Sequence, residues 1–438
     1  MINMKKIFKV SMLGIALLGL AACGDKKEEA TTTKDLSAIY DYNEKLDPNE
    51  AVTINMFQNA PEYSDQFNQL YDEYKKLHPN VTINLEITQS DYATVLKTKL
   101  NSSSQPDVFS TNSGEEIESY KDYSLDLSGT PLEKQIDSNL LDSFSADGKL
   151  YGIPFKTDAF GLIYNKDLFK KAGISEVPKT LDELEDVCQK LDAKGIQPFT
   201  TGFKESWVNK QVFQQFVSTQ SAGKPKEFVE SLNTGEDKIS NYPLLTDNWF
   251  RLVDLVKKYG DKKPLETDLN AQLTAFATNK AAMIFGQGTW VEGDILKVDD
   301  KMPIGFTAWP ISDNPDEAKI VLGSDLAIRI NKNSKVKDWA VDLFNFMYTS
   351  DYGKKWFKDI AKVIPPRKDV SYPDRPIANQ VEEIKKEYDP LPLTNIYSME
   401  AFQTRFGETM QKYYFGDLKK EQAISEIEKA YVDLGSAH

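Results

Sequence analysis

Apolar and polar side chains alternate along residues 52–56, which predicts a strand with one buried face. Apolar residues then recur at helical spacing from Phe67 to Leu77, and a second alternating stretch covers residues 81–87. Ser64 stands where an N-cap is expected, and Pro79 marks the end of the helix. A strand, a helix and a strand in this order predict a βαβ unit with parallel strands and a right-handed crossover.

Helices and strands continue to alternate along the rest of the chain. A helix is predicted from Thr180, which stands three residues before Glu183 as in a capping box, to Gly195, and a strand around Phe199 follows it. Two further amphipathic helices are predicted over residues 339–347 and 418–434. The pattern is typical of an α/β protein. About 390 residues follow the N-terminal region, which predicts two domains.

The N-terminus combines a positive start with a short apolar run. Three lysines precede an apolar stretch over residues 10–20, which is shorter than the roughly 20 residues of a membrane span and is typical of a secretory signal. Leu20-Ala21-Ala22 leads directly into Cys23, and this junction resembles the lipobox of bacterial lipoproteins. The resemblance implies that residues 1–22 are a signal peptide and that Cys23 carries a lipid. An ordinary signal with a chance cysteine is the alternative.

Charge and cysteine content exclude several classes of partner and site. Residues 23–50 are charged and threonine-rich, so they predict a flexible tether. The net charge is −14, which disfavours nucleic acid and anionic lipid as partners. Cys188 is the other cysteine, and it falls in an apolar helical series that predicts a buried structural thiol.

Several motifs occur in a fixed order along the chain. They are Pro106-Asp107-Val108-Phe109, Tyr151-Gly152-Ile153-Pro154, Tyr164-Asn165-Lys166-Asp167-Leu168-Phe169, Pro178-Lys179-Thr180-Leu181-Asp182-Glu183-Leu184, and Phe276 to Met283 followed by Gly288-Thr289-Trp290. Together they resemble the signature of family 1 extracellular solute-binding proteins, the receptors of sugar ABC importers. The resemblance covers nearly all of the chain from Val52 onward.

The resemblance implies an α/β fold of the type II periplasmic-binding-protein class, with two discontinuous lobes, three hinge crossings and a ligand cleft between the lobes. The crossings are expected near residues 154–160, 306–311 and 362–368. Lobe 1 is expected to comprise residues 51–157 plus about 309–365, and lobe 2 residues 158–308 plus about 366–438.

The resemblance also implies how the protein works and where it acts. We expect a monomeric receptor without cofactor or catalysis, whose partners are a carbohydrate, in particular a small oligosaccharide, and the permease subunits of an ABC transporter. The lipid is expected to be its only membrane attachment, on the extracytoplasmic face of a Gram-positive-like bacterial cell.

A sugar site needs aromatic side chains for the C–H faces and polar groups for the hydroxyls. Trp290 follows a glycine-containing loop after an apolar strand, where the family commonly has its stacking tryptophan, against the alternative of a core residue. Asp158 stands six residues before Tyr164, where maltose-binding proteins carry a ligand-binding acid, although it could also be a cap or an ion-paired acid. Trp207 is a candidate for a second stacking position.

The remaining candidates have ordinary structural alternatives. Turn and cap roles suit Asn59, Glu62 and Asn112 almost equally well. Arg367 could serve a hinge instead, and Tyr397 could close the pocket from the C-terminal segment. The remaining candidates are Asn59, Glu62, Asn112, Ser324, Asp325, Arg367 and Tyr397.

Two other classes of function are weighed against a sugar receptor. A secreted glycoside hydrolase needs two carboxylates at a controlled separation, and 67 acidic residues show no catalytic spacing that stands out. A receptor for a peptide would share the two-lobed architecture. Metal binding and a Ser-His-Asp triad are disfavoured, because the histidines are His78 and the terminal His438.

Overall fold

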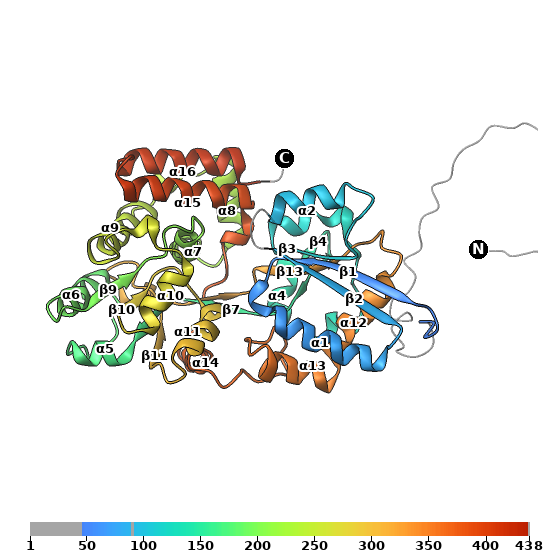
Figure 1. Ribbon diagram of the computed structural model, residues 1–438. Helices are drawn as coiled ribbons and strands as arrows, with labels where there is room; N and C mark the ends of the chain where they lie inside the picture. The colour runs from blue at the N-terminus through green and yellow to red at the C-terminus, as the bar shows by residue number, and fades with distance from the viewer. Residues whose placement is uncertain (1–45, 89–91, 437–438) are drawn as a thin grey trace, which may run out of the picture. The chain divides into compact units, whose positions relative to one another are not determined.

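The computed structural model describes residues 46–88 and 92–436 of the 438-residue chain (Figure 1). The predicted signal peptide, Cys23 and the tether up to residue 45 lie outside the described residues. Among the described residues, no helix combines the length and apolar character that a membrane span requires.

A five-stranded sheet contains the predicted βαβ unit. Its strand order is β2-β1-β3-β13-β6. The strands are β1 (Val52–Gln58), β2 (Val81–Ile87), β3 (Val108–Asn112), β6 (Ile153–Pro154) and β13 (Leu326–Ile330). β1 pairs in parallel with β2 and β3, whereas β13 runs antiparallel to β3 and β6. The predicted parallel pairing of the first two strands is confirmed.

Helices cover both faces of this sheet because alternate residues of β1 point to opposite sides. Ile54 and Met56 share a core with the helices α1 and α12, and Phe57 on the other face packs with α2. The helices of this part of the chain are α1 (Ser64–Leu77), α2 (Tyr92–Leu100), α3 (Glu115–Ser119), α4 (Ser138–Leu141), α12 (Lys337–Thr349) and α13 (Asp351–Lys355). The predicted amphipathic helix over residues 339–347 is therefore confirmed within α12.

Two details of the first helix differ from the prediction. Ser64 is the first residue of α1 and not its N-cap, because a 3₁₀ turn over Pro61–Tyr63 leads straight into the helix and leaves Tyr63 at the cap position. Leu77 continues the apolar spacing but is 56% exposed, because it stands in the last position of the helix.

A second sheet has four strands in the order β11-β8-β10-β9. The strands are β8 (Leu162–Asn165), β9 (Gln197–Thr200), β10 (Ala281–Ile284) and β11 (Ile304–Thr307). β10 runs parallel to β9, and β8 runs antiparallel to both β10 and β11. The strand predicted around Phe199 is β9.

Two clusters of buried side chains flank the second sheet. One of them includes residues of the C-terminal pair α15 and α16, which lie side by side in Figure 1. The helices are α5 (Lys166–Lys171), α6 (Leu181–Asp192), α7 (Val208–Gln220), α8 (Pro225–Thr234), α9 (Trp249–Tyr259), α10 (Leu269–Ala277), α11 (Glu292–Val298), α14 (Pro376–Glu387), α15 (Glu400–Phe415) and α16 (Lys420–Leu434). α16 confirms the predicted helix over residues 418–434.

Helix α6 begins with the predicted capping box. The backbone N–H of Glu183 donates to Thr180 Oγ1 at 3.2 Å, and the Glu183 carboxylate accepts from the Thr180 N–H at 3.2 Å. Gly195 follows the helix with a φ of +69°, a conformation that glycine adopts without a steric penalty. Cys188 is fully buried in this helix, and burial raises the pKa of its thiol, so the predicted structural role is confirmed.

The chain passes between the two sheets three times, and the first passage is bonded to each of the other two. The first passage contains β7 (Asp158–Phe160), which pairs antiparallel with β12 (Val321–Gly323) of the second. The backbone N–H of Thr157 donates to the carbonyl of Ile364 in the third passage at 2.8 Å. The three passages therefore lie next to each other.

We predict that Thr180→Ala lowers the free energy of unfolding by about 1 kcal/mol, because the first turn of α6 loses a side-chain acceptor. Urea denaturation of purified protein measures this difference. Lys190→Ala, an exposed change in the same helix, serves as the control and should stay within about 0.5 kcal/mol of wild type. Equal midpoints for Thr180→Ala and the control would show that this cap does not limit stability.

Candidate functional site

The candidate site lies at one edge of the five-stranded sheet. Asn59 follows the carboxyl end of β1, and Asn112 ends β3. β13 runs the opposite way, so Ser324 and Asp325, just before its start, lie at the same edge as Asn112. The backbone N–H of Ser113 donates to the Asp325 carbonyl at 2.8 Å. Loops beyond the carboxyl ends of strands are where α/β folds commonly bind ligands.

Lys156 is the charged centre of this site, and the sequence analysis did not identify it. It is 4% exposed, and its ammonium donates to the Asp158 carboxylate, which is 2% exposed. Lys156 Nζ lies 3.7 Å from Asp325 Oδ1, close enough for an ion pair but too far for a direct hydrogen bond. One buried base thus stands between two acids from different passages of the chain.

Thr289 and Trp290 extend the site from the second sheet. Thr289 Oγ1 donates to Asp158 Oδ1 at 2.8 Å. The half-buried ring of Trp290 lies 5.3 Å from the ring of Phe160, and Lys156 Nζ lies 6.0 Å from the indole. The indole N–H donates to Gln287 Oε1 at 3.1 Å, which fixes the direction of the ring. The structure therefore brings Trp290 and Asp158 together around Lys156.

Two polar atoms of the site lack hydrogen-bond partners in the described part of the chain. Ser324 is 1% exposed, and its hydroxyl has no partner there. Asp325 Oδ1 is buried and also has none. A buried polar atom that forms no hydrogen bond costs about 1–3 kcal/mol, so both atoms are available to a ligand that supplies hydroxyl groups.

Further charged side chains face Asp325. Burial lowers the pKa of Lys210 on α7, while Glu400, Asp325 and Glu116 oppose that shift. Loss of hydration raises the pKa of Glu62 although its surface is exposed, and Lys156 opposes this shift. Residues from both sheets therefore share one electrostatic environment around Asp325.

Three other predicted site residues do not belong to the charged group around Lys156. Asn59 is bonded through its side chain to Ser110, whose hydroxyl donates at 2.9 Å. Trp207 is half-buried at the start of α7 and packs against the core of the second sheet. Tyr397 packs on the same apolar cluster as Trp290. The structure brings Tyr397 near Trp290 and places Trp207 against the core.

Arg367 binds to the protein itself. It is 4% exposed, donates twice to Asp369 at 2.8 Å, and donates to the carbonyl of Tyr348 and to Gln135 Oε1. The contacts with Tyr348 and Gln135 hold the third passage against α12 and against the 3₁₀ turn over Glu133–Gln135. They favour the hinge role that the sequence left open over contact with a ligand.

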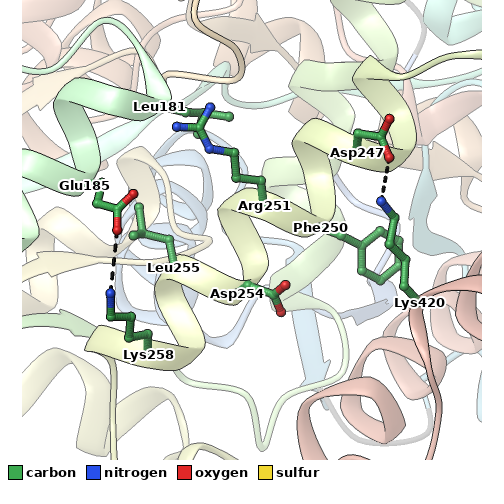
Figure 2. A pocket seen from close by; sticks show the side chains of 9 residues that line it. All are labelled: Leu181, Glu185, Asp247, Phe250, Arg251, Asp254, Leu255, Lys258 and Lys420. Atoms are coloured by element: carbon green, nitrogen blue, oxygen red, sulfur yellow. Dashed lines mark hydrogen bonds and ion pairs between the residues drawn. The ribbon is translucent and has the colours of Figure 1, made fainter.

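A separate surface pocket of about 370 Å³ lies among α6, α9 and α16 (Figure 2). Its charged side chains are already engaged. Glu185 pairs with Lys258 at 3.6 Å, Asp247 pairs with Lys420 at 2.5 Å, Arg251 binds Asp313 at 2.6 Å, and Asp254 accepts from Tyr413. These pairs brace neighbouring helices and leave few polar groups for a ligand, unlike the site around Lys156.

Within residues 46–88 and 92–436, no group of three or more His, Cys, Asp or Glu side chains is arranged to hold a metal ion. His78 caps the C-terminal end of α1, and its Nε2 lies 3.5 Å from Asp342 Oδ2. Its predicted helix-end position is confirmed.

Two α/β parts joined by three passages, with a polar site at the strand ends, define the class of two-lobed type II solute receptors. Residues 60–354 match the sequence pattern of the bacterial extracellular solute-binding protein family, so the chain belongs to that family. The resemblance noted in the sequence is thus confirmed.

Individual relatives agree with this assignment. The chain is 25% identical to the multiple sugar-binding protein of Streptococcus mutans over 359 residues, which cover 81% of this chain and 80% of that protein. It is 22% identical to the melibiose/raffinose/stachyose-binding protein MelE of Bacillus subtilis, covering 78% and 77%. The structure of RafE in complex with raffinose superposes with a TM-score of 0.75 at 22% identity, covering 86% of this chain and 98% of that one.

Glu292 gives the region beside Asp158 a specific pH dependence. Glu292 is 2% exposed and accepts the Ile377 N–H at 2.7 Å. Burial raises the pKa of Glu292 from 4.5 to about 7, and the Ile377 hydrogen bond and Arg375 limit the rise. The folded state therefore binds more protons than the unfolded state between these two values, so this carboxyl lowers stability as the pH rises from 4.5 to 7.

We predict that Glu292→Gln removes this dependence, because the amide can accept the Ile377 N–H without titrating. The free-energy difference between the two proteins should change by about 3 kcal/mol across pH 4.5–7.5, at 1.36 kcal/mol per pKa unit. Urea unfolding at several pH values measures the difference. Parallel stability curves for variant and wild type would contradict the shifted pKa.

Proposed function

We propose that this protein is the extracellular substrate-binding receptor of an ABC importer and that it binds a small oligosaccharide. Its family is that of extracellular solute-binding proteins, and the names of its relatives include receptors for several sugars. The observation that carries the proposal is the half-buried Trp290 ring beside the buried charged group of Lys156, Asp158 and Asp325.

This combination fits the two kinds of surface on a sugar. The indole offers an apolar plane for the C–H face of a ring. Asp158 and Asp325 accept hydrogen bonds from hydroxyls, and Lys156 donates to them. A hydroxyl both donates and accepts, so one hydroxyl can bridge Lys156 and Asp325 across the 3.7 Å that separates them.

We propose that the receptor binds its sugar without turnover, as a monomer, and delivers it to the permease subunits of the transporter. The family and its named relatives are binding proteins, which supports this proposal over a secreted glycoside hydrolase. Relatives named for sugars support a sugar over a peptide ligand.

We propose closure of two lobes about the three passages as the binding mechanism. Lobe 1 consists of residues 51–157 and a segment to about 365, and lobe 2 contains the rest. Trp309 and Ile311 pack in the core of the second sheet, which supports starting that segment of lobe 1 after Ile311 and not near residue 309. A ligand favours the closed form only when it contacts both lobes, and the site draws side chains from both sheets.

We predict that Trp290→Ala and Asp158→Asn each weaken sugar binding at least about tenfold. Removing an aromatic plane or a charged acceptor costs about 1.5–3 kcal/mol, and 1.4 kcal/mol is one decade in affinity. Calorimetric titration after a saccharide screen measures the loss, and small-angle scattering of the same samples reports closure.

Trp290→Phe is the matched variant, since Trp290 also packs on Phe160. It should keep the apo melting temperature and more of the affinity than Trp290→Ala. Chromatography of the bound sugar should return it intact. A wild-type protein that binds no saccharide, or that releases shortened products, would overturn the proposed function.

We further propose that Cys23 anchors the receptor by lipid to the outer face of the cell membrane, in a Gram-positive-like cell. The Leu20-Ala21-Ala22-Cys23 sequence supports this, together with the extracellular family. Cys23→Ser should abolish labelling by a radioactive fatty acid and release the protein into the medium. Mature protein that retains residues 1–22, or unchanged labelling of Cys23→Ser, would contradict the anchor.

A further inference from the structure

A groove of about 520 Å³ is lined in part by Thr289 and Trp290, whereas Lys156 is not among its lining residues. Glu62 and Gln66 line it from the first part of the chain, and α11 lines it from the second. Sites of about 300–1,000 Å³ hold ligands of several rings. The groove is therefore large enough for more than one sugar ring, and Trp290 forms part of its lining.

We propose that this groove holds the sugar units beyond the one stacked on Trp290, and that Arg375 is the residue that makes the receptor prefer oligosaccharides to monosaccharides. The inference rests on the proposed function and deepens it, because it assigns the selection of ligand length to a second set of residues.

The guanidinium of Arg375, which is unpaired among the described residues, is the first observation that supports the proposal. Arg375 stands directly before α14 and is half-buried, and in the described chain its guanidinium forms no hydrogen bond or ion pair. The guanidinium rests on the backbone of Gly293, where an added Cβ would lie 3.2 Å from a terminal nitrogen. A planar group with five unused N–H donors, held against a wall of the groove, matches two neighbouring hydroxyls of a sugar.

Lys362 and Gln66 provide a second, independent observation. Lys362 lines the groove with a φ of +53°, a backbone conformation that costs a non-glycine residue energy and that concentrates at functional sites. Gln66 also lines the groove, and its buried Oε1 has no hydrogen-bond partner in the described chain. The lining of the groove therefore offers both unused donors and an unused acceptor.

The charges along the groove define the chemistry of its ligand. Four acidic residues, Glu62, Asp294, Asp300 and Asp374, line it together with four basic ones, Lys297, Lys301, Lys362 and Arg375. The lining is therefore electrically balanced and has no excess of positive charge for a phosphate or a carboxylate. Hydrogen bonds to an uncharged, hydroxyl-rich chain suit such a surface best.

Calorimetric titration with sugars of increasing length tests the proposal. The probes are galactose, melibiose, raffinose and stachyose, with malto-oligosaccharides and chito-oligosaccharides of one to four units as alternative series. In the series that wild type binds, affinity should rise at least tenfold from one unit to three. Arg375→Gln should lose at least tenfold for the trisaccharide and stay within twofold of wild type for the monosaccharide.

Two further variants keep the result interpretable. Lys386→Ala is the matched control, because Lys386 lies on α14, the helix that follows Arg375, but does not line the groove; it is paired with Glu383 at 2.6 Å and is largely exposed. It should bind every length as wild type does. Lys362→Ala should repeat the length-dependent loss if Arg375→Gln does not fold.

The outcomes separate this inference from the proposed function. Equal losses at every length, or no loss for the trisaccharide, would overturn the role of Arg375 and leave the sugar receptor intact. Wild-type protein that binds no member of any series would overturn the proposed function and this inference together.

Discussion

The ion pairing of Lys156 with Asp158 and Asp325 is the interaction on which the rest of the site depends. Lys156 and Asp158 are almost completely buried, and an unpaired charge at either position would cost several kcal/mol. Removal of one partner of such a pair commonly costs about 3–5 kcal/mol, because the remaining charge stays buried. The three side chains therefore constrain one another, and the positions of the acceptors are set by the folded chain itself.

This charged group also joins the passages between the two sheets. Asp158 begins β7 and pairs with Gly323 of β12, while Asp325 follows two residues later on the same passage. Gly323 approaches Leu393 so closely that a Cβ would come within 2.7 Å of its side chain. A ligand that hydrogen bonds to Asp158 or Asp325 thus acts directly on the strands about which the two parts would move.

Local patterns in the sequence predicted what depends on neighbouring residues. The capping box at Thr180 and the βαβ unit were correct, because both follow from spacing within one segment. The prediction that Ser64 is the N-cap of the first helix was wrong, because a 3₁₀ turn leads directly into α1 and places Tyr63 at the cap position. Lys156 was missed, because its importance comes from Asp325, which the strand pairing brings near from far along the chain. The motif around Trp290 predicted a ligand contact, which stays a prediction, and only the structure shows that the ring lies beside Phe160 and Lys156.

The proposed contact of Trp290 with a sugar would link the ligand to the passages, because Trp290 packs on them. The indole contacts the ring of Phe160 of β7 at an interplanar angle of 59°, and Phe160 packs with Val321 of β12 and Leu393. Trp290 is half-buried, and in the proposed complex its exposed part stacks on a single unit of the ligand. Its support comes from β7 of the first passage and from the apolar cluster that flanks the second sheet. In the proposed closure a movement of β7 would therefore shift the indole, and a sugar held against it would favour the arrangement in which its hydroxyls also meet Asp158.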